Sequence, residues 1–152
     1  MTLAFEDFPP GPFGTFGPLH VTRDDIIEFA SEFDPQPMHL NDEAAGRSML
    51  RSLSGSGWHM SALTMRLLVD GFLGRSVTLG SPGIEEAKWI SPLRPGDDLM
   101  LDVEVREARP LRSRPDIGLV TFACRLRNGD ETRLTMVSPI MFKRRAAIEA
   151  GA

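Results

Sequence analysis

The chain of 152 residues lacks tyrosine and contains one cysteine and three histidines. A single cysteine, Cys124, excludes an intramolecular disulfide framework, and so few scattered ligand residues offer no metal-binding spacing. No apolar run approaches the roughly 20 residues that a transmembrane helix requires. The chain also does not open on a cationic stretch followed by an apolar one, as a secretory signal does. These absences predict a soluble protein in a reducing, cytoplasmic setting, with no membrane contact and no metal.

An excess of positive charge is also missing. The 17 basic residues against 21 acidic ones give a net charge of −4, which lacks the basic balance that phosphate-backbone binding usually leaves in a sequence. We therefore expect no nucleic-acid partner. The length and the hydrophobic content of 41% suffice for one domain with a real core, and we predict a single domain over residues 1–152.

The first third of the sequence predicts two helices joined by a stiff loop. Residues 5–20 are rich in glycine, proline and phenylalanine, which indicates an irregular arm or an edge strand. A capping box at Thr22 and apolar residues at helical spacing predict a helix over residues 23–33. Pro35 and Pro37 end it, because each disfavours helical backbone at the preceding residue. Asp34 and His39 therefore lie on a loop before a second, short helix.

A third, longer helix is predicted over residues 57–70. Its apolar residues lie on almost every side, with Trp58, Met65 and Val69 on one stripe, so we expect it to be buried. It begins at a Gly-Ser-Gly sequence, residues 55–57. Glycine lets another group approach the free amide N–H groups at the positive end of the helix dipole. A carbonyl group or an anion would fit there.

The rest of the chain alternates with a period of two, which is typical of β-strands. Residues 98–108 and 117–126 place apolar side chains on one face and mostly polar ones on the other. Asn128-Gly129 predicts a hairpin leading into a last strand, where Pro139 indicates a bulge or an edge position. We expect an antiparallel sheet whose apolar face is covered by the helix of residues 57–70.

The order of these motifs resembles a known family. A helix is followed by Asp-Pro-Gln-Pro-Met-His at residues 34–39, by a helix opening with Ser-Gly-Trp at 56–58, and by Trp-Ile-Ser-Pro-Leu-Arg-Pro-Gly-Asp at 89–97. Over residues 15–142 the chain resembles the MaoC-like hydratases and dehydratases, relatives of (R)-specific enoyl-CoA hydratase. The resemblance implies an α+β hot-dog fold, in which an antiparallel sheet wraps a long buried helix, with a flexible arm before and a tail after it. It also implies a homodimer or a higher homo-oligomer.

The resemblance places Asp34 and His39 on the two catalytic positions of the family. Adding water across an α,β-unsaturated acyl-CoA thioester requires a base, a proton donor for Cα and stabilisation of an enolate-like oxygen. A carboxylate and an imidazole can share the first two tasks around one water. Backbone N–H groups of Gly57 and Trp58 would provide the third as an oxyanion hole. No cofactor is expected beyond the coenzyme A of the substrate.

The sequence departs from the family pattern at three positions. Phe33 replaces a glycine before the aspartate, and Gln36 replaces the asparagine between the aspartate and the histidine. Ser56 stands where a histidine often precedes the glycine at the helix start. These exchanges bear on the hydrogen bonding around the carboxylate and on the width of the pocket.

Simpler interpretations remain open for several of these residues. Asp34 can serve only to end a helix and His39 only to lead into the next one, and the glycines of residues 55–57 can serve only close packing. Arg112 and Arg114, with Arg109, can bind the phosphates of coenzyme A through bidentate contacts or belong to a solvated loop.

Two further side chains are expected to be structural. His59, within the apolar helix, is interpreted as a hydrogen-bonded structural histidine, and Cys124 as a small core residue. For His20 the sequence suggests no partner.

Three functions fit the sequence. The first is a hydratase or dehydratase acting on an enoyl-CoA or 3-hydroxyacyl-CoA, which the Asp34/His39 pair favours. The second is a hot-dog acyl-CoA thioesterase, which would use the same helix start but would not need this pair at this spacing. The third is a non-catalytic, acyl-binding hot-dog subunit.

Overall fold

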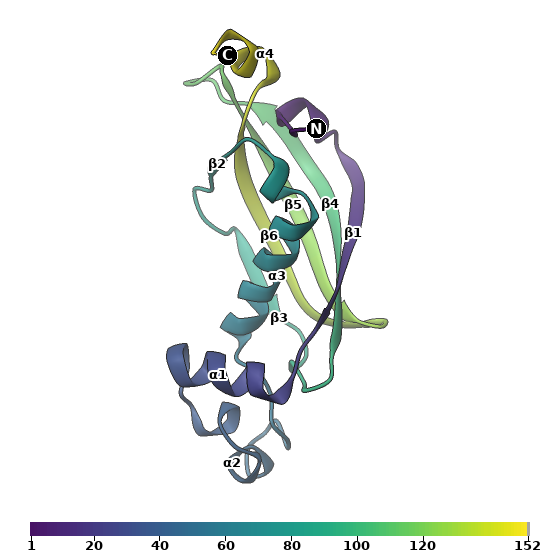
Figure 1. The fold of residues 1–152 in the computed structure, drawn as a ribbon, viewed down its shortest axis with the longest axis vertical. Helices are drawn as coiled ribbons and strands as arrows, with labels where there is room; N and C mark the ends of the chain where they lie inside the picture. Colours follow the sequence, from purple (N-terminus) through teal and green to yellow (C-terminus); the bar gives the residue numbers. More distant parts are fainter. Residues whose placement is uncertain (152) are drawn as a thin grey trace.

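The computed structural model describes residues 1–151 and contains an antiparallel sheet with a long helix along one face (Figure 1). The strands are β1 (Gly11–His20), β2 (Thr78–Gly80), β3 (Glu86–Trp89), β4 (Asp98–Pro110), β5 (Ile117–Asn128) and β6 (Glu131–Lys143). Their order is β1-β4-β5-β6-β2, and β3 also pairs with β6. The helices are α1 (Arg23–Phe33), α2 (Asp42–Gly46), α3 (Gly57–Gly71) and α4 (Arg145–Ala150). Three short 3-10 turns are η1 (Phe5–Asp7), η2 (Pro37–His39) and η3 (Leu73–Arg75).

The long strands form where the sequence alternates, as predicted. In β4 the side chains of Leu99, Leu101, Val103 and Val105 are buried on the face that meets α3. The β5–β6 hairpin turns at Gly129, whose φ of 58° lies in the left-handed region that glycine adopts readily. The predicted hairpin and the predicted antiparallel sheet are thus confirmed.

Pro139 occupies a local edge within β6. Its partner on one side is Thr121 of β5, and the register is continuous there. On the other side, the pairing of β6 with β3 ends at Val137 and its pairing with β2 begins at Met141, so Pro139 has no strand partner there. Its carbonyl accepts instead from the Ser81 hydroxyl. Of the two predicted alternatives the edge position is correct, because the missing N–H of proline faces a gap in the sheet.

The core of the domain is rich in phenylalanine. The rings of Phe8 and Phe142 lie 4.4 Å apart, and Phe13, Phe72 and Phe122 pack around them. Aromatic pairs in such tilted and edge-on arrangements add to the stabilisation from burial alone. Phe8 and Phe13 precede residue 15, so the packed core includes part of the segment that the sequence assigned to an arm.

Helix α3 is buried on one side only. Met60, Thr64, Leu67 and Leu68 pack against the sheet. Trp58, Met65 and Val69 remain 65%, 41% and 42% exposed on the opposite side. The prediction of a helix buried all round is therefore wrong for the single chain, and an apolar stripe is left facing outward.

Helices α1 and α2 lie beyond one end of the sheet, next to the start of α3 (Figure 1). Helix α1 begins with the predicted capping box, because Thr22 and Asp25 each accept a hydrogen bond from the other's backbone N–H, at 2.9 and 3.0 Å. Asn41 caps α2 by accepting from Ala44 N–H at 2.8 Å. The loop that carries Asp34 and His39 is therefore anchored at both ends by capped helices.

The last helix, α4, lies at the end of the molecule opposite α1 and α2 (Figure 1). The segment after Lys143, predicted to be a solvated tail, forms α4, where Arg145 makes an ion pair with Asp7 and its N–H donates to Glu6 at 2.9 Å. Within residues 1–151 no helix combines the length and the apolar character needed to cross a membrane.

Candidate active site

Asp34 and His39 come together because the loop between α1 and α2 turns sharply. Asp34 follows the last residue of α1, and its N–H donates to Ala30 at 2.9 Å. Turn η2 then bends the chain so that His39 Nε2 lies 3.6 Å from Asp34 Oδ2. An extended segment of five residues would separate the two by up to ~17 Å. Asp34 thus ends a helix, and it also faces the imidazole.

The tautomer of His39 follows from its other ring nitrogen. Nδ1 lies 2.6 Å from the backbone oxygen of Ser54. A carbonyl oxygen can only accept a hydrogen bond, so Nδ1 must carry a proton. In the neutral ring Nε2 then holds the free lone pair, and this atom faces Asp34. The role of Ser54 could not be predicted from the sequence, because a backbone carbonyl leaves no signal in the residue type.

Asp34 is held in its charged form. The Ser56 side chain is the main cause that lowers the pKa of the Asp34 carboxyl below its usual value, and Gln36 acts in the same direction by donating from Nε2 to Asp34 Oδ1 at 2.7 Å. Partial burial opposes both, and His39 adds a smaller favourable effect. At neutral pH Asp34 is a carboxylate, suited to act as a base. Two of the three departures from the family pattern, Gln36 and Ser56, thus support the aspartate.

A cavity of about 420 Å³ opens over this pair. This size is in the range of small-molecule sites. Asp34, Gln36 and His39 supply its polar groups, and its apolar wall is formed by Met38, Trp58, Met60, Trp89, Ile90 and Pro92. Wider hollows of about 540 and 550 Å³ lie on the outer face of the sheet and between α1 and α3, and neither is lined by Asp34 or His39.

The two predicted oxyanion donors differ in the structure. Trp58 N–H donates to the Ser56 hydroxyl at 3.2 Å, within the helix start, so it is already in use. Gly57 N–H has no acceptor in the part of the chain that the structure describes, and Gly57 lines the cavity. The geometry therefore favours Gly57 over Trp58 as a donor to a bound carbonyl.

Gly57 also permits a close contact that the sequence did not reveal. A Cβ atom on Gly57 would lie 2.3 Å from the Trp89 ring, and one on Gly55 would lie 2.6 Å from Leu93. Both glycines thus serve close packing, as the simpler interpretation held. For Gly57 this packing and a free N–H occur together, because Trp89 lies over the helix start and forms part of the cavity wall.

Arg112 and Arg114 lie far from the cavity within one chain. The loop between β4 and β5 that carries them is at the end of the sheet next to α4, opposite α1 and α2 (Figure 1). Arg114 is bound to Asp116 through two hydrogen bonds of 3.0 and 2.8 Å, and Arg109 lies 3.6 Å from Glu107. The chain does not by itself bring these arginines to the Asp34/His39 pair.

The other titratable side chains take structural positions. His59 is buried and stacks on Phe29 at 4.5 Å, but its Nδ1 has no partner among the described residues, so the expected hydrogen bond is wrong. Burial lowers its pKa, which keeps the ring neutral. Cys124 is buried in β5, and burial raises its pKa to about 12, which confirms a core role. His20 pairs with Asp98 at 2.7 Å on the surface.

Comparison with known proteins identifies relatives over most of the chain. The family model described as "MaoC like domain" matches residues 5–121. An uncharacterised protein of Bacillus subtilis (strain 168), YdeM, is 30% identical over 133 residues, which make up 87% of this chain and 92% of that protein.

Solved structures share the fold. The MaoC-like dehydratase from Rhodospirillum rubrum is 38% identical and matches with a TM-score of 0.86, over 94% of this chain and 98% of that one. The unliganded R-hydratase PhaJ1 from Pseudomonas aeruginosa matches with a TM-score of 0.72 over 95% and 88% of the two chains, at 17% identity. The predicted α+β hot-dog fold is thereby confirmed.

Proposed function

Because the chain belongs to the MaoC-like domain family, we propose that it is a hydro-lyase that interconverts an enoyl-CoA and a 3-hydroxyacyl-CoA, with Asp34 and His39 as its catalytic residues. One observation carries this proposal. A carboxylate with a lowered pKa faces an imidazole of defined tautomer across 3.6 Å, and both line a cavity of about 420 Å³.

The distance between the two groups suits a shared water. At 3.6 Å the Asp34 and His39 atoms are too far apart for a good direct hydrogen bond, whereas one water can bond to both. In hydration, one proton of this water passes to the pair and its oxygen bonds to Cβ of the enoyl group. The pair returns one proton to Cα, so the protein ends the turnover with its initial number of protons. Dehydration is the same sequence reversed.

The electrons displaced from the double bond accumulate on the thioester oxygen. Gly57 N–H, at the positive end of the α3 dipole and on the cavity wall, is the donor we assign to that oxygen. The reaction changes no net oxidation state, so it needs no redox cofactor. Coenzyme A enters as part of the substrate.

We further propose that the working form is a homodimer. Trp58, Met65 and Val69 form an exposed apolar stripe on α3, beside the exposed Trp89 and Ile90. Exposed apolar residues that lie together mark an interaction surface, and this one suits a second copy of the chain. Arg112 and Arg114 would reach coenzyme A only if a partner copy brought its own β4–β5 loop to the cavity. Light scattering at micromolar concentration should give a dimer, and Val69→Asp should give a monomer.

The reaction is tested by two assays on one preparation. Hydration is followed by loss of enoyl absorbance with crotonyl-CoA and with longer enoyl-CoA substrates. Release of free thiol from saturated acyl-CoA is followed in parallel. Hydration without thiol release supports the proposal. Thiol release without hydration would indicate a thioesterase, and binding of acyl-CoA with neither reaction would indicate a non-catalytic subunit.

A further inference from the structure

The Ser54 carbonyl that binds His39 belongs to the loop over residues 50–55, which contains no helix or strand. Arg51 within it has a φ of 65°, in the left-handed region that non-glycine residues seldom adopt. The Ser54 hydroxyl is buried and has no partner among the described residues, so Ser54 is not held through its side chain. The position of the Ser54 carbonyl therefore depends on contacts from elsewhere in the chain.

Arg94 supplies those contacts. Its Nη2 donates to the Leu50 oxygen at 2.8 Å, and Nη1 donates to the Ser52 oxygen at 2.8 Å and to the Leu53 oxygen at 3.3 Å. The same nitrogen also donates to the Ser52 hydroxyl at 2.8 Å. A planar guanidinium can bind several carbonyls at once in a fixed geometry, which a lysine cannot do. One side chain thus binds three backbone carbonyls of the loop.

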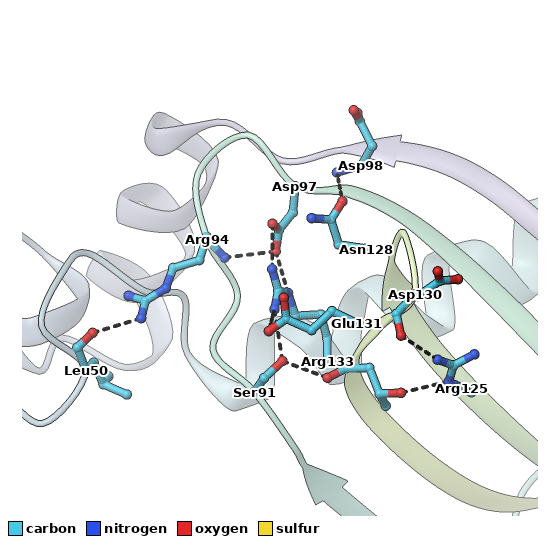
Figure 2. A network of polar contacts seen from close by, with 11 residues as sticks. Leu50, Ser91, Arg94, Asp97, Asp98, Arg125, Asn128, Asp130, Glu131 and Arg133 are labelled. Atoms are coloured by element: carbon cyan, nitrogen blue, oxygen red, sulfur yellow. Dashed lines mark hydrogen bonds and ion pairs between the residues drawn. The ribbon is translucent and has the colours of Figure 1, made fainter.

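Arg94 is itself fixed by a buried ion pair. Its backbone N–H donates to Asp97 Oδ2 at 3.0 Å, and Arg133 binds both oxygens of Asp97, at 2.8 and 2.9 Å (Figure 2). The side chains of Arg133 and Asp97 are only 5% and 4% exposed. Next to Arg94, the Leu93 carbonyl accepts from Gly55 N–H at 2.8 Å. A rigid connection therefore runs from β6 through Asp97 and Arg94 to the residues on both sides of Ser54.

We propose that Arg94 is a positioning residue for His39. By holding the loop, it keeps the Ser54 carbonyl against Nδ1–H, and this contact fixes the tautomer and aims Nε2 at Asp34. Arg94 does not line the cavity over the Asp34/His39 pair, so it acts through the loop. The catalytic consequence rests on the function proposed above, whereas the effect on the His39 ring does not.

The test replaces the arginine and observes His39 directly. Arg94→Gln removes the guanidinium. Arg94→Lys keeps the positive charge but cannot bind several carbonyls in the same fixed geometry. The imidazole nitrogens of His39 are observed by NMR on labelled protein and assigned by comparison with His39→Gln. We expect the wild type to show the neutral ring protonated at Nδ1, and Arg94→Gln to show a mixture of tautomers. Arg94→Lys should lie between the two, and it remains informative if Arg94→Gln fails to fold.

Kinetics provide the second measurement. Misplacing a catalytic group by about 1 Å can cost up to ~100-fold, so kcat should fall by about 10- to 100-fold in Arg94→Gln with little change in KM. Arg127→Gln is the matched control. It removes a guanidinium that likewise makes several hydrogen bonds, to both oxygens of Asp102 at 2.7 and 3.1 Å and to the Gly129 oxygen at 2.9 Å, but none to the loop over residues 50–55. It should leave the His39 ring and kcat unchanged at a comparable melting temperature.

The outcomes separate the two proposals. A folded Arg94 variant with an unchanged His39 ring would overturn the positioning role, whatever its activity. A changed ring with lower kcat supports it. A changed ring in a protein that has no hydratase activity in either form supports the positioning role and removes the proposed reaction.

Discussion

Two aspartate–histidine pairs lie in contrasting surroundings on this chain. His20 Nδ1 and Asp98 Oδ1 are 2.7 Å apart, and their side chains are 59% and 66% exposed. His39 Nε2 and Asp34 Oδ2 are 3.6 Å apart, with exposures of 8% and 16%. The exposed pair is a direct contact between two groups that water also surrounds. The buried pair is longer and lies in the wall of a cavity.

The difference shows that contact distance alone does not identify a reactive pair. An exposed contact of this kind competes with water and contributes at most about 1 kcal/mol to stability. In the buried pair a third group fixes each partner, Ser54 for His39 and Gln36 for Asp34. The facing atoms do not satisfy each other, so both remain available to a substrate water. Four experiments test this contrast.

The largest effect is expected for Asp34→Asn. The amide preserves the shape of the side chain but cannot take a proton from water, so kcat should fall by at least about 100-fold. The melting temperature should change little. The matched control is Asp98→Asn, which alters the exposed pair in the same way and should leave kcat within about twofold. Equal activity in both variants would remove Asp34 from the proposed mechanism.

A similar loss is expected for His39→Ala, because the two groups act on one water. The double variant Asp34→Asn/His39→Ala should cost much less than the product of the single effects, as for groups that work as a unit. His20→Ala serves as the control. When it is combined with Asp34→Asn, the two effects on kcat should multiply, as expected for independent sites. Rates of all four proteins on one enoyl-CoA complete the cycle. Strict multiplication of the Asp34 and His39 effects would mean that they act independently.

The third experiment concerns the amide next to the buried pair. Gly57→Val cannot isolate it, because any Cβ there meets Trp89 at 2.3 Å. In a Trp89→Ala background, Gly57→Ala and Gly57→Pro both add a Cβ, and only proline removes the N–H. Proline is well tolerated at the first position of a helix, and the extended backbone of Ser56, with φ −58° and ψ 143°, suits a following proline.

We expect kcat of the proline variant to lie about 100-fold below that of the alanine variant, the usual effect of one lost oxyanion donor. Their melting temperatures should agree, since the N–H of the first helical residue makes no intrahelical bond. Equal kcat values would assign Gly57 to packing against Trp89 alone.

The helices and strands were predicted better from the sequence than the contacts around Asp34 and His39, the two residues that the resemblance singled out and that lie 3.6 Å apart. Capping at Thr22, alternation in β4 and β5, and the turn at Asn128-Gly129 are local signals, and the structure follows them. Other features are contacts between distant segments. These are the hydrogen bond from His39 to the Ser54 carbonyl, the packing of the Trp89 ring on Gly57, and the hydrogen bonds from Arg94 to the loop over residues 50–55. They depend on how the segments pack, which no local pattern encodes.

The same limit explains why the burial of α3 was misjudged. The residues of α3 indicated burial, because apolar side chains on all sides exclude a free surface. The sheet of one chain covers only the side of Met60 and Leu67, and leaves Trp58, Met65 and Val69 exposed. A pattern records that a face must be covered, but it does not say whether the same chain or a second copy covers it.

The smallest expected effect concerns the electrostatics of Asp34. The Ser56 side chain contributes most to the lowered pKa of Asp34, so Ser56→Ala should raise that pKa. The catalytic base is active above its pKa, and the acidic limb of kcat/KM should therefore move to higher pH. Ser76→Ala is the control, because Ser76 donates to the Phe72 oxygen, away from the cavity, and should not move this limb.

The free energy of unfolding should depend on pH through the same lowered pKa of Asp34. A carboxyl whose pKa is lower in the folded state than its value of about 3.9 in the unfolded chain stabilises the fold above the unfolded pKa. This contribution disappears as the pH falls through the folded pKa. Ser56→Ala removes part of it, so the loss of unfolding free energy relative to the wild type should be full at neutral pH and diminish in acid. Denaturant titrations at neutral and acidic pH measure this difference. A loss that is independent of pH would assign Ser56 to capping α3 rather than to the charge on Asp34.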